Sequence, residues 1–207
     1  MNLEEQFGQI DIYLFDQMLR GRIRRGMRVL DAGCGGGRNL VYLLQEGFDV
    51  HASDADPMAV AHVRELCARL APELPAHQRI REAFVERMPW DDASMDVVIC
   101  NAVLHFARSD DQFDAMVREL WRVLAPGGLF FARLASSIGM APSDLRATAD
   151  GRFRLPDGSE RYLVDEVRLM AATRELGGQL LDPLKTTVVQ NQRCMTTWVL
   201  RKPDGSR

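Results

Sequence analysis

The sequence predicts an α/β protein with a doubly wound, mostly parallel sheet. Three observations lead to this fold class. Short apolar runs alternate with segments of helical periodicity through the first two thirds of the chain. A glycine-rich loop at residues 33–37 follows the first apolar run, and two extended runs, closely joined, come near the end. The length of 207 residues suits one domain with a modest extension.

The first half of the chain is expected to hold an N-terminal amphipathic helix followed by two strand–helix units. Apolar side chains recur at helical spacing in the first segment, and Pro57 suits the first turn of a later helix. The expected elements are a helix over 3–19, a strand over 27–32, a helix over 39–46, a strand over 48–53 and a helix from Pro57.

The rest of the sequence predicts three more strands of the sheet, followed by a hairpin, a helix and two antiparallel extended runs. A continuous apolar run at 94–100 indicates a strand covered on both faces. Two extended runs joined by only a few residues must be antiparallel. The expected elements are strands over 79–85, 94–100 and 129–135, helices over 110–124 and 164–176, a hairpin over 153–163, and extended runs over 180–190 and 193–200.

Composition and charge exclude several classes of partner. The net charge of −3 and pI near 5.8 give no electrostatic case for nucleic acid or an anionic membrane. No apolar run reaches the ~18 residues that span a bilayer, and the acidic first ten residues do not fit a secretory signal. We interpret the arginines at 20–28 as a solvated helix end.

The cysteines favour reduced thiols over a metal site or disulfides, because they are scattered and form no C-x-x-C pair. They are Cys34, Cys67, Cys100 and Cys194. We therefore expect a cytoplasmic protein without a bound metal.

The spacing of the glycines decides between ligand classes. In the dinucleotide fingerprint G-x-G-x-x-G the third glycine would fall on Arg38 or Leu40, so both frames fail. The phosphate-binding P-loop fails as well, because no Gly-Lys-Ser or Gly-Lys-Thr follows. The pattern that fits is D-x-G-x-G-x-G, made by Asp31, Gly33, Gly35 and Gly37.

The residues around this loop favour an amino-acid nucleoside as the ligand. Asp31 offers a carboxylate to a cation such as an ammonium, and the N–H groups at the start of the following helix suit a carboxylate. Asp54, at the end of the second strand, is placed to bind a ribose diol, 54 − 33 = 21 residues after Gly33. Ammonium, carboxylate and ribose together do not describe a pyrophosphate cofactor.

This constellation resembles the class I S-adenosylmethionine-dependent methyltransferases. The matching segments are "VLDAGCGGGRN", "DVHASDADPMAV", "MPWDDASMDVVICNAVLHF" and "WRVLAPGGLFF", in that order along the chain. The loop and the compact size are also loosely similar to the small tellurite-resistance and thiopurine-type branch. The resemblance implies a Rossmann-like sheet of seven strands with an antiparallel last strand, S-adenosyl-L-methionine as cofactor and S-adenosyl-L-homocysteine as product.

The resemblance also implies a set of cofactor-binding residues. Asp31 would bind the amino group, Arg38 and Asn39 would lie at the helix start near the carboxylate, and Asp54 would bind the ribose. The position of the family's adenine-binding acid is Phe84 here, so adenine recognition would rest on ring packing, on backbone at Val85 or on Glu86. The full set is Asp31, Gly33, Cys34, Gly35, Arg38, Asn39, Asp54, Ala55, Phe84, Val85, Glu86 and Asn101.

Candidates for the chemistry itself are fewer. His105 has a side chain suited to a general base near neutral pH. The alternative is a structural role, because its segment also has the pattern of a first helical turn after the strand at 94–100. Tyr13 is a second candidate at the acceptor site, with Arg133, Tyr162 and Arg193 as further lining residues. Transfer from a sulfonium requires alignment of the nucleophile more than strong acid or base, so positioning and desolvation can supply most of the rate.

The acceptor is expected to be a small molecule. Residues 101–104 read Asn-Ala-Val-Leu, which lacks the Pro-Pro-aromatic tetrad of amino-directed DNA methylases. The expected division is a cap helix at 1–25, a cofactor-binding core at 26–135, an insertion over the acceptor site at 136–163, and a helix with antiparallel strands at 164–207, in a monomer or homodimer. Two alternatives stay open: a non-catalytic protein that binds this cofactor and acts through a partner, and a nicotinamide oxidoreductase.

Overall fold

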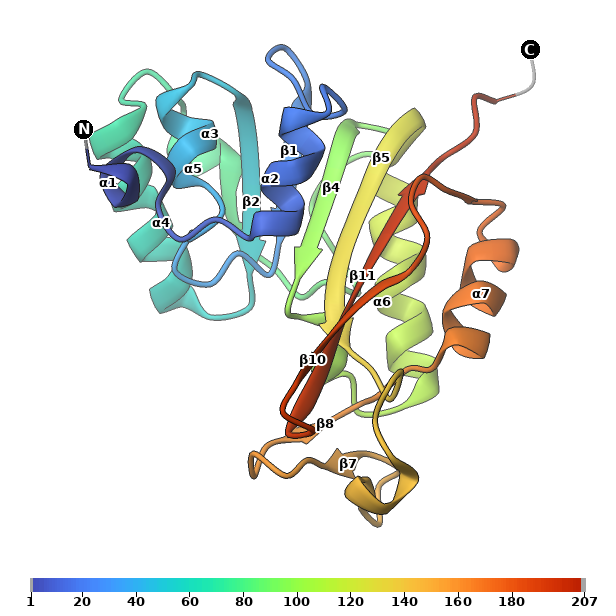
Figure 1. Ribbon diagram of the computed structural model, residues 1–207. Helices are drawn as coiled ribbons and strands as arrows, with labels where there is room; N and C mark the ends of the chain where they lie inside the picture. Colours follow the sequence, from blue (N-terminus) through green and yellow to red (C-terminus); the bar gives the residue numbers. More distant parts are fainter. Residues whose placement is uncertain (1, 206–207) are drawn as a thin grey trace.

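An eight-stranded sheet forms the centre of the computed structural model, which describes residues 2–205 (Figure 1). Seven strands follow the order β10-β11-β5-β4-β1-β2-β3, and β9 also pairs with β11. β11 runs antiparallel to β5, β9 and β10, and the other pairs of this sheet are parallel. The strands are β1 Arg28–Ala32, β2 Asp49–Asp54, β3 Ile80–Glu82, β4 Met95–Asn101, β5 Leu124–Ala135, β9 Gln179–Leu180, β10 Lys185–Val189 and β11 Arg193–Arg201. The predicted α/β class and the reversed last strand are confirmed.

The expected number of seven strands is wrong by one because the extended run over 180–190 is interrupted. Pro183 cannot donate to a ladder, and Asp182 turns aside to accept a hydrogen bond from Arg22 at 2.7 Å. The run therefore pairs with β11 in two pieces, β9 and β10, on either side of this interruption.

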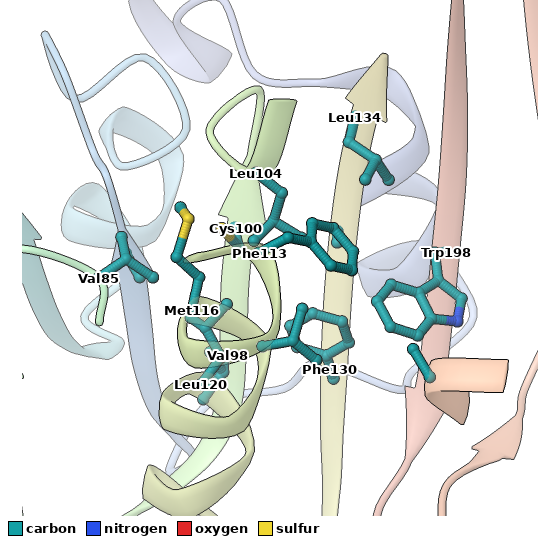
Figure 2. Close-up of a cluster of buried hydrophobic side chains, with 14 of the residues drawn as sticks. Val85, Val98, Cys100, Leu104, Phe113, Met116, Leu120, Phe130, Leu134 and Trp198 are labelled. Atoms are coloured by element: carbon teal, nitrogen blue, oxygen red, sulfur yellow. The ribbon is translucent and has the colours of Figure 1, made fainter. Parts of the chain in front are cut away.

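Helices cover both faces of the sheet. They are α1 Leu3–Phe7, α2 Ile12–Leu19, α3 Val41–Gln45, α4 Pro57–Leu70, α5 Ala76–Arg79, α6 Asp110–Val123 and α7 Glu166–Glu175. Alternate residues of β4 enter opposite cores: Val98 and Cys100 pack with α6, whereas Val97 and Ile99 pack with α2, α3 and α4. Figure 2 shows the first core, where Phe113 and Leu120 of α6 meet the strand residues.

The single helix expected over 3–19 is two helices. Gly8 ends α1 with φ +59°, a left-handed conformation that glycine adopts without strain. Asp11 then caps α2, because its side chain accepts a hydrogen bond from the Tyr13 amide at 2.9 Å. The apolar periodicity continued across the break, but these two local signals override it.

Several other boundaries differ from the prediction. The third strand covers only Ile80–Glu82, the helix expected over 39–46 is limited to Val41–Gln45, and α5 was not expected. The fifth strand begins at Leu124, directly after α6, because Leu124 already pairs with Met95 of β4. The segment Ala125-Pro-Gly-Gly is an irregularity in this pairing, which resumes at Leu129 opposite Val97.

The predicted hairpin over 153–163 is confirmed and is part of a small antiparallel sheet. Its strands are β6 Arg146–Ala147, β7 Phe153–Arg154 and β8 Glu160–Arg161. Figure 1 shows β7 and β8 at the end of the main sheet toward which β4 and β5 run. This places the segment beside the carboxyl ends of the parallel strands.

The arginines at 20–28 form the predicted solvated helix end only in part. Arg20 is the exposed C-cap of α2, and Arg24 and Arg25 are exposed, but several of the arginines form ion pairs with acids of distant segments. Arg20 and Arg22 pair with Asp182 at 3.3 and 2.7 Å. Arg28 pairs with Asp96 at 2.8 Å. The first two contacts join the end of α2 to the interruption between β9 and β10, and the third joins β1 to β4.

Helices able to cross a membrane do not occur in residues 2–205, since none is both long enough and apolar enough. The four cysteines are buried and unpaired. Within the same residues, no three His, Cys, Asp or Glu side chains gather as a metal would require.

Candidate functional site

A cavity of about 610 Å³ lies at the carboxyl ends of β1, β2 and β4. Ligands of open α/β sheets bind at this edge, where loops from several strands converge. Every predicted cofactor-binding residue except Asp31 lines the cavity. The lining also includes residues that the sequence did not indicate: Gln9, Gly36, Ala83, Ala102, Val103, Phe106, Gln112 and Met116.

The glycine loop supplies one wall as bare backbone. Gly33 has φ +77°, and a Cβ there would lie 2.4 Å from a methyl carbon of Val103. A Cβ at Gly35 or Gly36 would meet no atom within 4 Å, so these two positions face open space. Close packing therefore requires glycine at position 33, whereas the next two glycines let a ligand approach the main chain.

Asp54 is held in a fixed orientation at the end of β2. Its Oδ2 accepts a hydrogen bond from the Gly35 amide at 2.8 Å, and its Oδ1 accepts one from the Asp56 amide at 2.9 Å. Each oxygen keeps acceptor capacity for a diol. Asp56 is the N-cap of α4, as predicted, because it accepts a hydrogen bond from the Met58 amide at 2.9 Å.

Asp31 is the most unusual group near the cavity. It is 1% exposed, and neither carboxylate oxygen has a hydrogen-bond partner among the described residues. Burial raises its pKa to about 7, against the opposing effects of the Arg38 charge and of the nearby Asn39 side chain. It is not on the cavity wall but lies on β1, two residues before Gly33. A buried acid without a partner beside the glycine loop fits a ligand that carries an ammonium.

Arg38 and Asn39 do not lie at a helix start, because α3 begins at Val41. Arg38 reaches across the cavity and donates a hydrogen bond to Asn101 Oδ1 at 3.2 Å. Asn39 is buried and accepts a hydrogen bond from the Asp11 amide at 3.1 Å. Their side chains thus connect the glycine loop to β4 and to the N-terminal segment.

The opposite end of the cavity is partly apolar. Phe84 is 68% exposed there, and Glu86 accepts a hydrogen bond from the Gln112 side chain. Gln112 and Met116 stand one turn apart on α6, so helical spacing would have placed them on a common face. Gln9 carries no comparable signal, since it lies in the irregular segment between α1 and α2.

A second cavity, of about 360 Å³, adjoins the first and shares Arg38, Ala102 and Phe106 with it. Ala102 has φ +64°, a conformation that a residue with a Cβ rarely adopts and that is often found at functional sites. The rest of the lining is His105, Arg133, Ala135, Leu155, Asp157, Ser159, Arg161, Val189, Arg193 and Met195.

His105 lines this second cavity, but its geometry does not suit the general base that the sequence suggested. Its Nδ1 accepts a hydrogen bond from the Ala135 amide at 3.1 Å, so the neutral ring carries its proton on Nε2. Burial, followed by the positive charge of Arg161, lowers the pKa to about 4. The side chain is therefore a hydrogen-bond donor at neutral pH and has no free basic nitrogen.

The two tyrosines proposed near the acceptor lie elsewhere. The Tyr13 hydroxyl is 2.8 Å from the Thr187 hydroxyl, and neither cavity includes Tyr13. Tyr162 stacks on Phe113 with ring centroids 5.2 Å apart. Tyr13 thus connects α2 to β10, and Tyr162 connects the segment after β8 to α6.

With this geometry established, the comparisons with known proteins identify the family. Residues 30–132 match the family model described as "Methyltransferase domain". The chain belongs to the class I S-adenosylmethionine-dependent methyltransferases. The looser likeness to the tellurite-resistance and thiopurine-type branch stays a prediction.

Two curated methyltransferases illustrate the sequence similarity. A probable S-adenosylmethionine-dependent methyltransferase of Mycolicibacterium smegmatis is 34% identical over 117 residues, which are 56% of this chain and 41% of the relative. A malonyl-[acyl-carrier protein] O-methyltransferase of Pectobacterium atrosepticum is 33% identical over 111 residues, which are 53% of this chain and 40% of the relative. In each case the matched region is less than half the length of the relative.

A solved methyltransferase structure shares the fold over most of the chain. It is the 1,6-didemethyltoxoflavin-N1-methyltransferase of Burkholderia thailandensis, with bound 1,6-didemethyltoxoflavin and S-adenosylhomocysteine. The TM-score is 0.66 at 23% identity, covering 90% of this chain and 76% of that chain. The Rossmann-like methyltransferase fold is thereby confirmed.

Proposed function

We propose that this protein transfers a methyl group from S-adenosyl-L-methionine to a small-molecule acceptor and releases S-adenosyl-L-homocysteine. The observation that carries the proposal is the pairing of a bare-backbone wall with two differently held carboxylates. Asp54 is fixed against Gly35, whereas Asp31 is buried without a partner. A diol suits the first carboxylate and an ammonium suits the second.

The cofactor would occupy the first cavity. Asp31 would attract the amino group, directly or through water, with the backbone carbonyl of Asn101 as a further acceptor. Backbone at residues 33–35 would contact the methionine chain, and Asp54 and Ala55 would hold the ribose. The adenine would pack near Phe84 and Val85, with Glu86 and Gln112 as hydrogen-bonding groups beside it.

The second cavity would hold the acceptor. When bound, S-adenosylmethionine supplies a methyl group on a positively charged sulfur, which keeps the electron pair of the broken carbon–sulfur bond. Arg38, Ala102 and Phe106 border both cavities, so the acceptor would meet the methyl group there. Because His105 has no free basic nitrogen, we infer that alignment and exclusion of water supply the rate.

The non-catalytic alternative receives support from Phe84, which replaces the family's adenine-binding acid. The adjoining second cavity weighs against it, since a protein that only binds the cofactor has no need of a contiguous site. The oxidoreductase alternative is disfavoured by the family match. A cytoplasmic location and a monomeric or homodimeric state are likewise proposals.

Calorimetric titration with S-adenosylhomocysteine and with NADH tests the cofactor assignment. We expect S-adenosylhomocysteine to bind with a dissociation constant well below the millimolar range and NADH to give no saturable signal. Binding of NADH alone, or of neither compound, would overturn the proposal. Transfer of labelled methyl to an acceptor panel then separates a transferase from a protein that only binds the cofactor.

A further inference from the structure

The second cavity is strongly cationic. Four arginines line it, whereas Asp157 is its only carboxylate among the residues that the structure describes. The arginines are Arg38, Arg133, Arg161 and Arg193. They come from the glycine loop, from β5, from β8 and from the start of β11, so the fold brings together charges that are far apart in the sequence.

Partners inside the protein neutralise only part of this charge. Arg133 donates to Asp11 at 3.0 Å, and Arg38 lies 4.0 Å from the same carboxylate. Arg193 lies 4.0 Å from Asp157, at the limit of an ion pair. Asp11 and Asp157 thus lie within 4.0 Å of three of the four guanidinium groups.

Arg161 is the guanidinium without an acidic partner. No carboxylate of residues 2–205 lies within 4.0 Å of it. Its Nη1 donates to the Glu160 carbonyl at 2.8 Å, and its guanidinium lies 4.9 Å from the centroid of the Phe106 ring. These contacts fix the side chain beside the border of the two cavities and leave donors for a ligand.

His105 adds a neutral donor to the same wall. Because the Ala135 amide occupies Nδ1, the Nε2–H has no partner in the described part of the chain. The cavity therefore offers guanidinium and imidazole N–H groups together with the Ser159 hydroxyl, and Asp157 is the only anionic acceptor.

We propose that the acceptor is a small organic acid whose carboxylate is bound by Arg161 and Arg193. This inference rests on the proposed function, since it names the substrate class of the second cavity. A planar carboxylate can accept two parallel hydrogen bonds from one guanidinium, and His105 donates a further one. A neutral acceptor would leave the Arg161 guanidinium without a carboxylate within ion-pair distance.

Matched acids and amides test the charge requirement without knowledge of the natural acceptor. Acetate, benzoate and phenylacetate are each compared with the corresponding amide on protein saturated with S-adenosylhomocysteine, by ligand-observed NMR. We expect at least one acid to bind about tenfold or more tightly than its amide, the range of charge-assisted hydrogen bonds. Equal affinity within all three pairs would overturn the proposal.

Variants assign the preference to the cavity. Arg161→Gln is expected to reduce the acid preference to less than about threefold. Arg161→Lys keeps the charge but not the planar guanidinium, so its acid preference is expected to lie between those of wild type and Arg161→Gln. Arg24→Gln is the control, because that side chain makes no hydrogen bond or ion pair within residues 2–205. An unchanged preference in Arg161→Gln, or an equal loss in Arg24→Gln, would overturn the assignment.

The cofactor titration separates this inference from the proposed function. If S-adenosylhomocysteine binds and the acids show no preference over the amides, only the carboxylate proposal fails. If S-adenosylhomocysteine does not bind, the proposed function fails, and the acid preference is then measured on the ligand-free protein. Unchanged S-adenosylhomocysteine affinity in Arg161→Gln verifies that this variant is folded.

Discussion

The carboxylate of Asp54 accepts a hydrogen bond from the Gly35 amide at 2.8 Å and so joins the end of β2 to the glycine loop. The contact orients the acid and the loop backbone together, before any ligand is present. A site assembled in this way requires little reorganisation on binding. Asp54 ends β2, and Gly35 lies in the loop that follows β1, the parallel neighbour of β2.

Asp54→Ala is expected to weaken S-adenosylhomocysteine binding by about 1–3 kcal/mol, because charge-assisted hydrogen bonds to the ribose are lost. Isothermal titration calorimetry measures the change. The matched control is Asp56→Ala, which removes only the cap of α4 and should lower stability by about 0.5–2 kcal/mol. Equal losses of affinity in the two variants would contradict the ribose assignment.

Asp31→Asn is expected to stabilise the free protein above pH 7 and to weaken S-adenosylhomocysteine binding. Burial raises the folded-state pKa from 3.8 to about 7, so the folded state keeps a proton that the unfolded state has lost between these values. The contribution of Asp31 to stability is therefore present below about pH 4 and is lost as the pH rises through 7.

Urea unfolding of wild type and Asp31→Asn at pH 5 and pH 8 measures this effect. The stability difference between the two proteins should be larger at pH 8, on the order of a few kcal/mol at most. Although Asp31→Asn should be the more stable protein at pH 8, calorimetry should show that it binds S-adenosylhomocysteine more weakly than wild type. A variant less stable than wild type at pH 8 would show that the carboxylate has a partner.

Gly33→Ala is expected to destabilise the fold by about 1–3 kcal/mol. The added Cβ would lie 2.4 Å from Val103 and would be held at a positive φ. Gly36→Ala is the contrasting change, since its Cβ meets no atom within 4 Å and projects where the loop borders the cavity. Thermal unfolding should distinguish the two, and a similar melting temperature for both would refute the packing explanation.

Thr173→Val is expected to cost about 1–3 kcal/mol, because it leaves a buried donor unpaired. The Trp198 indole N–H donates to the Thr173 hydroxyl at 3.0 Å, and Trp198 is fully buried. Chemical denaturation of a double-mutant cycle with Trp198→Phe isolates the interaction. Additive effects of the two changes would mean that this hydrogen bond contributes nothing.

The His105 ring is expected to titrate near pH 4, because burial and the charge of Arg161 disfavour the imidazolium. The unfolded state binds a proton at about pH 6.5, so the contribution of His105 to stability is present above that pH and is lost as the pH falls toward 4. An NMR titration of the ring proton measures the pKa, and His105→Asn, which keeps an acceptor for Ala135, assigns the resonance. A measured pKa above 6 would contradict this expectation and would support His105 as a general base.

The sequence predicted most of the lining of the first cavity because its parts are local. Asp31 and the glycines are within seven residues of one another, and Asp54 ends the neighbouring strand of a parallel pair. Parallel strands bring such ends to one edge of the sheet. The break at Gly8 was signalled by glycine followed by a capping aspartate, but the apolar periodicity concealed it.

The acceptor side could not be predicted to the same degree. Arg161 lies on β8 and His105 in the 3₁₀ turn after β4. The packing of the small antiparallel sheet brings Arg161 to the second cavity, which His105 also lines. The direction of the His105 ring was decided by one tertiary hydrogen bond, from the Ala135 amide. No periodicity or residue spacing in the sequence indicates the position of Arg161 or the orientation of the His105 ring.

By itself, the sequence determined the fold class, the glycine wall and the two acids, because chain-local geometry and the ends of adjacent parallel strands fix those positions. Only the tertiary structure decided which donors line the second cavity and which nitrogen of His105 accepts a hydrogen bond. The reason is physical: charge and burial depend on side chains that meet through space, and segments such as β8 and β11 are brought there by packing rather than by any local pattern.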